Sequence, residues 1–161
     1  FWNFCDNYIE LVKVRLYNAD EQSKNSAKFA MYEVMLELLK MFSIYIPHVT
    51  EEIYQNTFKD TVKVESINNT LFSKLSIAAD KDLIRKGEEV CSVVSQVRGY
   101  KTDNKISLKT ELTTLEVVSP YDEFLQECAD DIKDATNAQN LVISHGETLS
   151  VGVHGIVEPQ E

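Results

Sequence analysis

The sequence predicts a mainly α-helical protein, in which an antiparallel helical bundle is followed by a small α+β subdomain of element order β-α-β-β. Apolar residues recur every three to four positions over most of residues 1–101, which is the period of amphipathic helices. After Asp103, apolar residues fall in short segments instead, which is typical of strands. Hydrophobic residues make up 43% and charged residues 26% of the 161-residue chain, the composition of a globular protein with its own core.

Helical periodicity and helix-stop residues place the elements of the bundle. Residues 18–25 form a polar connection between the first two helices. Pro47 lacks a backbone donor and disfavours helix in the residue before it, so the second helix should end near Ile46. Thr50 is expected to cap a short third helix, and residues 61–79 are expected to be mostly irregular. The expected helices cover residues 1–17, 26–45, a short stretch after Thr50, and 80–101.

The C-terminal third of the chain changes in pattern. The expected elements are a strand near 112–118 that ends at Pro120, a helix over 121–136, and strands over 141–144 and 148–153. We therefore expect two domains. A helical bundle occupies residues 1–109 and is incomplete at its N-terminus, and an acidic α+β subdomain occupies residues 110–161.

Charge is distributed unevenly along the chain. The net charge is −10, which disfavours binding to nucleic acid if the charge is spread evenly. Residues 1–109, however, hold 15 of the 16 Lys and Arg and 15 of the 26 Asp and Glu, whereas residues 110–161 hold Lys133 against the other 11 acids. Within residues 81–109, seven basic residues accompany four acidic ones. This net-positive stretch is the candidate surface for a nucleic acid.

The sequence offers little for catalysis. Its three cysteines, Cys5, Cys91 and Cys128, are far apart and form no C-x-x-C pair, so we expect core thiols of a cytoplasmic protein. The histidines are scattered, and no nucleophile elbow, P-loop or glycine-rich dinucleotide motif occurs. No apolar run reaches the roughly 20 residues of a membrane helix. We therefore expect no catalytic residue, no metal and no cofactor in this chain, and no membrane partner.

A row of basic residues is the remaining lead. Arg98, Lys101, Lys105 and Lys109 are three to four positions apart. If the helix persists they share one side of it, and if the helix ends near Lys101 they continue into a loop. Such a row is able to neutralise several phosphates. The alternatives are an ordinary solvated face, or a protein-interaction module that uses the acidic tail.

Several segments resemble the C-terminal anticodon-binding region of class I aminoacyl-tRNA synthetases, the valyl enzymes above all. Residues 4–13 read FCDNYIELVK and are similar to the FCDWYLE-K helix of that family. Residues 38–55 read LLKMFSIYIPHVTEEIYQ and resemble its "TEEIYQ" signature, without the extra proline often found at Ser43 or Ile44. Residues 97–101, VRGYK, resemble the end of a later family helix, and 106–112 resemble the passage into a strand.

The C-terminal part of the chain resembles one type of valyl enzyme more than the other. Residues 131–138, DIKDATNA, look like the tail of archaeal-type valyl enzymes, and no heptad arm like the bacterial coiled coil follows. The P-x-x-T-E-E-I motif is shared with isoleucyl and leucyl enzymes, so an equivalent domain of those enzymes stays an alternative. The opening helix favours the valyl family.

The resemblance implies a helical bundle of the anticodon-binding type that binds a tRNA anticodon stem-loop, with valine tRNA as the expected partner. The family's catalytic motifs are absent from this chain, and its base-reading residues lie on an earlier helix, expected before Phe1. Phosphate and stem contacts are therefore the implied role of a basic set. The parent enzyme, a monomer in the cytoplasm, would use ATP with magnesium in its own upstream catalytic domain to attach valine to tRNA. The basic set is Lys13, Arg15, Arg98, Lys101, Lys105 and Lys109.

Overall fold

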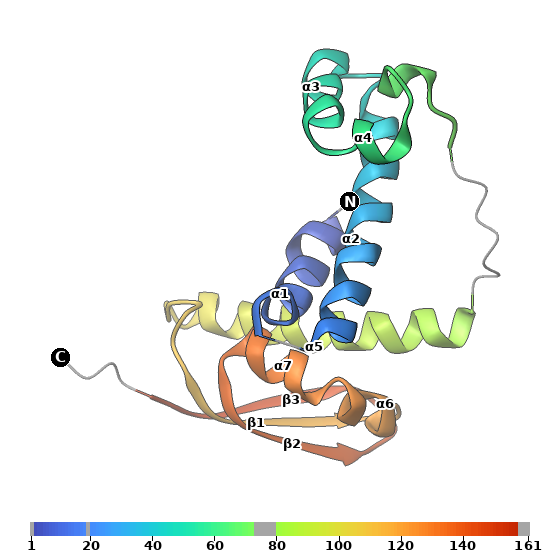
Figure 1. Ribbon diagram of the computed structural model, residues 1–161. Helices are drawn as coiled ribbons and strands as arrows, with labels where there is room; N and C mark the ends of the chain where they lie inside the picture. The colour runs from blue at the N-terminus through green and yellow to red at the C-terminus, as the bar shows by residue number, and fades with distance from the viewer. Residues whose placement is uncertain (1, 19, 73–79, 158–161) are drawn as a thin grey trace. The chain divides into compact units, whose positions relative to one another are not determined.

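The computed structural model describes residues 2–18, 20–72 and 80–157. It confirms the predicted fold class, because helices dominate and a small three-stranded sheet lies toward the C-terminal end (Figure 1). By packing, the chain divides into two compact units. The helical unit holds Asp20–Ala78, and the mixed unit combines Trp2–Ala19 with Ala79–Glu161. This packing groups the first helix with the sheet, while the division into domains at 1–109 and 110–161 stays a prediction.

The helical unit begins earlier than its periodicity indicates. Asp20 caps the first long helix, because its carboxylate accepts the backbone N–H groups of Gln22 at 2.9 Å and Ser23 at 3.0 Å. The expected polar connection over 18–25 is therefore too long, since helix already starts at Glu21. The unit contains α2 (Glu21–Phe42), α3 (Pro47–Thr57), α4 (Lys59–Val62) and a 3₁₀ turn (Ile67–Asn69).

The start of α3 corrects a second expectation. Pro47 occupies the first turn of α3, where a missing backbone donor costs nothing. Thr50 lies inside the helix instead of capping it, and its hydroxyl contacts the carbonyl oxygens of Ile46 and Pro47, each at 3.1 Å. The stretch 61–79 was expected to be mostly irregular. In its described part, 61–72, α4 reaches Val62 and the 3₁₀ turn covers Ile67–Asn69. Residues 73–79 lie outside the described residues.

A small core holds the helical unit together. Tyr32 packs on Phe58 with 5.0 Å between ring centroids. Tyr54 is fully buried, and its hydroxyl donates to the carbonyl of Val64 at 2.9 Å, which fastens the chain after α4 to α3. The buried apolar residues are Leu36, Leu39, Tyr54, Phe58 and Ile67.

The mixed unit is built around the sheet. Its expected helix over 121–136 is present but interrupted at Cys128, where α6 ends and α7 begins. The elements are a π-helical segment (Asn3–Tyr8), α1 (Ile9–Asn18), α5 (Lys81–Asp103), β1 (Leu112–Ser119), α6 (Asp122–Glu127), α7 (Ala129–Thr136), β2 (Ala138–His145) and β3 (Ser150–Ile156).

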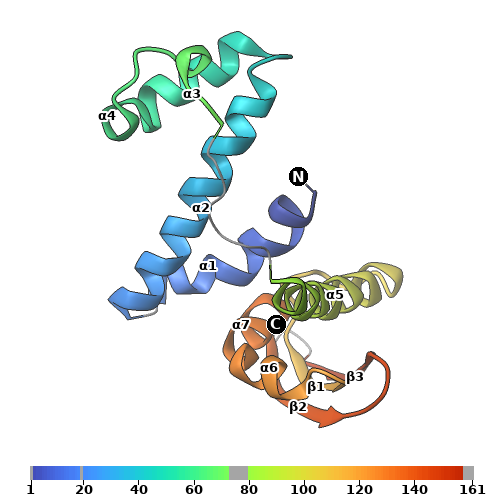
Figure 2. The same ribbon diagram turned by 90° about the vertical axis from the view of Figure 1, so that its right-hand side faces the viewer.

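The strand order is β2-β1-β3, with β1 parallel to β2 and antiparallel to β3. This is the predicted β-α-β-β unit, in which α6 and α7 form the crossover between the parallel strands. Helices α5, α6 and α7 lie over one face of the sheet (Figure 2). On that face Leu115 and Val117 are fully buried, whereas Glu116 on the other face is exposed. The strand predicted near 112–118 is thus present as β1, and its side chains alternate between core and solvent.

The core of the mixed unit joins the sheet to the helices. Helix α5 contributes a stripe of valines to this core. Their helical spacing is part of the pattern that predicted the helix. No described helix has the length and hydropathy to cross a membrane. The buried members of this core are Leu11, Val90, Val93, Val94, Val97, Leu112, Leu115, Val117, Leu125, Ile132 and Ala138.

Tyr54→Phe tests the attachment of the chain after α4. We expect the variant to lower the free energy of unfolding by about 1 kcal/mol, because one buried hydrogen bond is lost and the Val64 carbonyl loses its donor. Urea denaturation followed by circular dichroism measures the change. Tyr45→Phe is the matched control, since the Tyr45 side chain is 80% exposed. Equal effects of the two substitutions would contradict the assignment.

Candidate nucleic-acid interface

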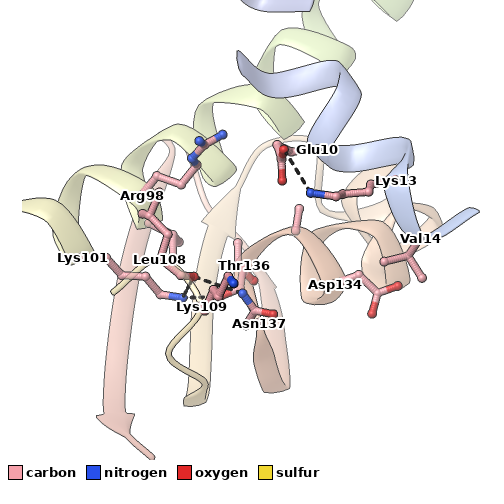
Figure 3. A pocket seen from close by; sticks show the side chains of 12 residues that line it. Glu10, Lys13, Val14, Arg98, Lys101, Leu108, Lys109, Asp134, Thr136 and Asn137 are labelled. Carbon is pink, nitrogen blue, oxygen red and sulfur yellow. Dashed lines mark hydrogen bonds and ion pairs between the residues drawn. The ribbon is translucent and has the colours of Figure 1, made fainter. Parts of the chain in front are cut away.

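A cavity in the mixed unit brings together four of the six basic residues predicted to contact tRNA. It has a volume of about 420 Å³ and lies between α1, α5, the loop after α5 and the end of α7 (Figure 3). Cations therefore reach one site from three separate segments of the chain. The lining residues are Glu10, Lys13, Val14, Val97, Arg98, Lys101, Leu108, Lys109, Asp134, Ala135, Thr136 and Asn137.

Lys13 and Arg98 stand on facing helices of this cavity. The Lys13 side chain is 59% exposed, and its ammonium lies 3.5 Å from the carboxylate of Glu10 one turn earlier on α1. An exposed pair at this distance is weak, so the ammonium remains able to bind a phosphate. The Arg98 guanidinium donates to the carbonyl of Asp6. Since a guanidinium has five N–H donors, this bond orients Arg98 and leaves donors for an anion.

Lys101 occupies a different environment from the other cations. Its side chain is 1% exposed, and its ammonium donates to three backbone carbonyls: Leu108 at 3.1 Å, Thr110 at 2.7 Å and Thr136 at 2.8 Å. No carboxylate of the described residues lies within ion-pair distance of it. Burial lowers the pKa of Lys101, because the charged form has lost water. With all three N–H donors used inside the protein, Lys101 is not placed to contact a phosphate.

Lys105 and Lys109 follow the end of α5. The helix stops at Asp103, so the second of the two arrangements considered for the basic row is the one observed. Lys105 adopts a left-handed backbone conformation with φ of 58°, is exposed, and does not line the cavity. Lys109 is exposed and lines it. The row therefore divides into two accessible cavity cations, Arg98 and Lys109, the neighbouring loop cation Lys105 and the buried cation Lys101.

Arg15 ties two helices together. Its guanidinium forms a two-pronged pair with the carboxylate of Asp131 on α7, in which Nε lies 2.7 Å from Oδ1 and Nη2 contacts Oδ2. This hydrogen bonding raises the pKa of Arg15. Arg15 does not line the cavity, and two of its N–H donors bind Asp131. Its position supports the packing of α1 on α7, which carry two walls of the site.

Four polar residues of the cavity were not predicted: Glu10, Asp134, Thr136 and Asn137. Glu10 lies one turn from Lys13. This spacing is typical of an ion pair on a helix, so the sequence could have indicated that Glu10 lies beside Lys13. Asn137 ends α7 in a left-handed conformation with φ of 53°, as helix-ending asparagines do, and donates to the Leu108 carbonyl at 3.1 Å. Partial burial, followed by the nearby charges of Asp130 and Asp131, raises the pKa of Asp134. No sequence pattern signals that Asp134 faces this cavity.

Comparison with known proteins identifies the family. A family model described as the anticodon-binding domain of tRNA ligase matches residues 1–118. The chain belongs to this family. It is 34% identical over 145 residues to a valine–tRNA ligase of Thermococcus kodakarensis, covering 89% of this chain and 16% of that protein. Valine–tRNA ligases of Tropheryma whipplei and Rickettsia akari are 36% and 33% identical, covering 91% and 95% of this chain. The chain spans less than a fifth of each relative, 17% and 19% for these two.

The "TEEIYQ" signature of this anticodon-binding domain has a structural use in the helical unit. Glu51 accepts the hydroxyl of Ser66 at 2.8 Å and the backbone N–H of Ile67 at 3.1 Å. Gln55 donates to the carbonyl of Glu65 and to the Glu51 carboxylate. The hydrogen bond from Gln55, the largest of several causes, lowers the pKa of Glu51. With Tyr54, these side chains hydrogen-bond residues 64–67 to α3. The motif therefore attaches the segment that leads into the 3₁₀ turn to this helix.

The anticodon-binding domain offers no evident metal centre within its described residues. His145 lies 2.9 Å from Asp122, and His154 lies 3.0 Å from Glu116, each as an exposed pair. The hydrogen bond with His145 lowers the pKa of Asp122. No group of three or more His, Cys, Asp or Glu among residues 2–18, 20–72 and 80–157 is arranged to hold an ion. The cavity presents lysine and arginine side chains, the residue types that pair with anions.

Acylation of lysines tests how the basic row divides. We expect an amine-reactive ester to modify Lys13, Lys105 and Lys109 readily and to leave Lys101 unmodified in the folded chain. A lowered pKa favours reaction, but burial dominates because the ester must contact the nitrogen. Peptide mass spectrometry measures the modification, with the urea-unfolded chain as control, in which all four lysines should react. Labelling of Lys101 at the rate of Lys105 in the folded chain would refute its buried placement.

Proposed function

We propose that the cavity of the mixed unit binds the phosphate backbone of a tRNA anticodon stem-loop. The observation that carries this proposal is the convergence of Lys13, Arg98 and Lys109 from α1, α5 and the following loop on one cavity. Cations placed this way neutralise neighbouring phosphates and release condensed counterions, which drives binding at moderate salt. Membership of the anticodon-binding family supports tRNA as the nucleic acid.

The six predicted residues divide by role in this proposal. Lys13, Arg98 and Lys109 contact phosphates in the cavity, and Lys105 contacts a phosphate beside it. Arg15 and Lys101 support the site from within, since Arg15 lies outside the cavity and pairs with Asp131, and the three donors of Lys101 are used by backbone carbonyls. RNA approaches on the side of the helices, because the opposite face of the sheet exposes Glu116 in the strongly acidic part of the chain.

The proposal extends to the parent protein. The relatives named above are valine–tRNA ligases. We infer that this chain belongs to such a ligase, with valine tRNA as its partner. An upstream catalytic domain of the same polypeptide would use ATP, with magnesium, to activate valine. We expect the parent to act as a monomer in the cytoplasm. The equivalent domain of an isoleucyl or leucyl enzyme is a less supported alternative, as is a protein-interaction module.

Salt-dependent binding tests the cavity. Lys13→Glu and Lys109→Glu should each weaken binding of a valine tRNA transcript, most strongly at low salt. Each should reduce the slope of log K against log salt concentration by about one, the effect of losing one phosphate contact. Fluorescence anisotropy at several salt concentrations measures both quantities.

Lys81→Glu is the matched control for these variants. Lys81 is exposed in the first turn of the same helix α5 and does not line the cavity. The substitution changes the charge of the chain equally, so a general charge effect would lower affinity to the same extent. Unchanged slopes for the two cavity variants would reject the site. Salt-independent or absent tRNA binding by the unaltered chain would favour the protein-interaction alternative.

A further inference from the structure

The loop after α5 is held at two points that bracket one residue. The carbonyl oxygens of Leu108 and Thr110 both accept hydrogen bonds from the ammonium of Lys101, at 3.1 and 2.7 Å. Lys109 lies between these two carbonyls in the sequence. The backbone on each side of Lys109 is therefore fixed to the same buried nitrogen.

The third bond of this ammonium fixes the loop to the opposite wall. Lys101 also donates to the carbonyl of Thr136 at the end of α7, at 2.8 Å. The next residue, Asn137, donates its side-chain amide to the Leu108 carbonyl at 3.1 Å. One buried cation thus joins α5, the loop and α7, which together form most of the cavity wall (Figure 3).

Lys105 provides the contrast within the same loop. It is held by a turn in which its backbone N–H donates to Thr102 and the N–H of Ile106 donates to the backbone carbonyl of Lys101. Neither bond uses the Lys101 side chain. The position of Lys105 should therefore survive loss of that ammonium, while the position of Lys109 should not.

The free-energy cost of burying the Lys101 ammonium indicates that its three hydrogen bonds serve the cavity. A buried ammonium without a carboxylate partner gives up its hydration, and only carbonyl dipoles replace that water. From these contacts we propose that Lys101 is a positioning residue, which holds Lys109 at the cavity so that its side chain meets a tRNA phosphate. This inference rests on the proposed binding of tRNA by the cavity.

A double-mutant cycle tests the inference in the 161-residue chain. Lys109→Ala is introduced into the unaltered chain and into the Lys101→Met chain, and binding of a valine tRNA transcript is measured by anisotropy over a range of salt. In the unaltered background, Lys109→Ala should reduce the salt slope by about one. In the Lys101→Met background it should have little further effect, because Lys109 is already displaced. Lys105→Ala is the control, and its effect should be the same in both backgrounds.

Hydrogen exchange gives a readout that does not depend on RNA. Lys101→Met should speed amide exchange at Lys109 and Thr110, whose N–H groups bond to Ser107 within the loop. Exchange at Lys105 and Ile106 should stay unchanged, since their turn does not involve the Lys101 side chain. Uniformly faster exchange through the whole loop would overturn a role specific to Lys109.

Asn137→Gly keeps the test decisive if Lys101→Met fails to fold. Glycine tolerates the left-handed backbone of this position. The variant therefore removes the hydrogen bond from the Asn137 side-chain amide to the Leu108 carbonyl with little strain. It should couple to Lys109→Ala in the same direction and more weakly. Additive effects of Lys109→Ala in both altered backgrounds would overturn the positioning role while leaving tRNA binding intact. Absence of tRNA binding by the unaltered chain would instead reject the proposed function.

Discussion

The buried ammonium of Lys101 and its three carbonyl acceptors connect the parts of the mixed unit that carry the site. Helix α5 supplies the cation, the loop before β1 supplies two acceptors, and the end of α7 supplies the third. Backbone carbonyls that leave water need donors, and one ammonium satisfies two in the loop and one at the end of α7. The same bonds close the connection from helix to sheet, because the next backbone bond, from Leu112 to Asn137, begins the pairing of β1 with β2.

A one-sided sheet explains how an acidic chain presents a basic site. The apolar face of the sheet is covered by α5, α6 and α7, and its other face meets solvent. Glu116 lies on the open strand face, and Glu123, Glu127 and Asp130 are exposed on the short helices α6 and α7. The cavity lies on the helical side, where Lys13, Arg98 and Lys109 outnumber Glu10 and Asp134. Since charges farther apart than about 10 Å are largely screened at 0.1 M salt, local balance matters more than net charge.

The sequence predicted the helices and strands better than it predicted the surroundings of individual side chains. The helical spacing of apolar residues in α5 and the short apolar segment of β1 identified both elements, because apolar side chains mark the buried face. The start of α2 was misplaced although Asp20 carries a capping signal. For Lys101, helical spacing put it beside Arg98, but its burial depends on loop carbonyls and on Thr136, 35 positions away. Periodicity within one helix holds no information about such a partner, so the cation was predicted as a surface contact.

The kind of contact that the cavity offers limits what it can discriminate. Lysine and arginine side chains that neutralise phosphates fix the position and orientation of a nucleic acid, whereas base identity is read by hydrogen bonds and stacking on the bases themselves. The accessible donors here are cations with little fixed geometry, apart from Arg98, which the Asp6 carbonyl orients. In the proposed complex, the mixed unit holds the backbone of the RNA and does not read its bases.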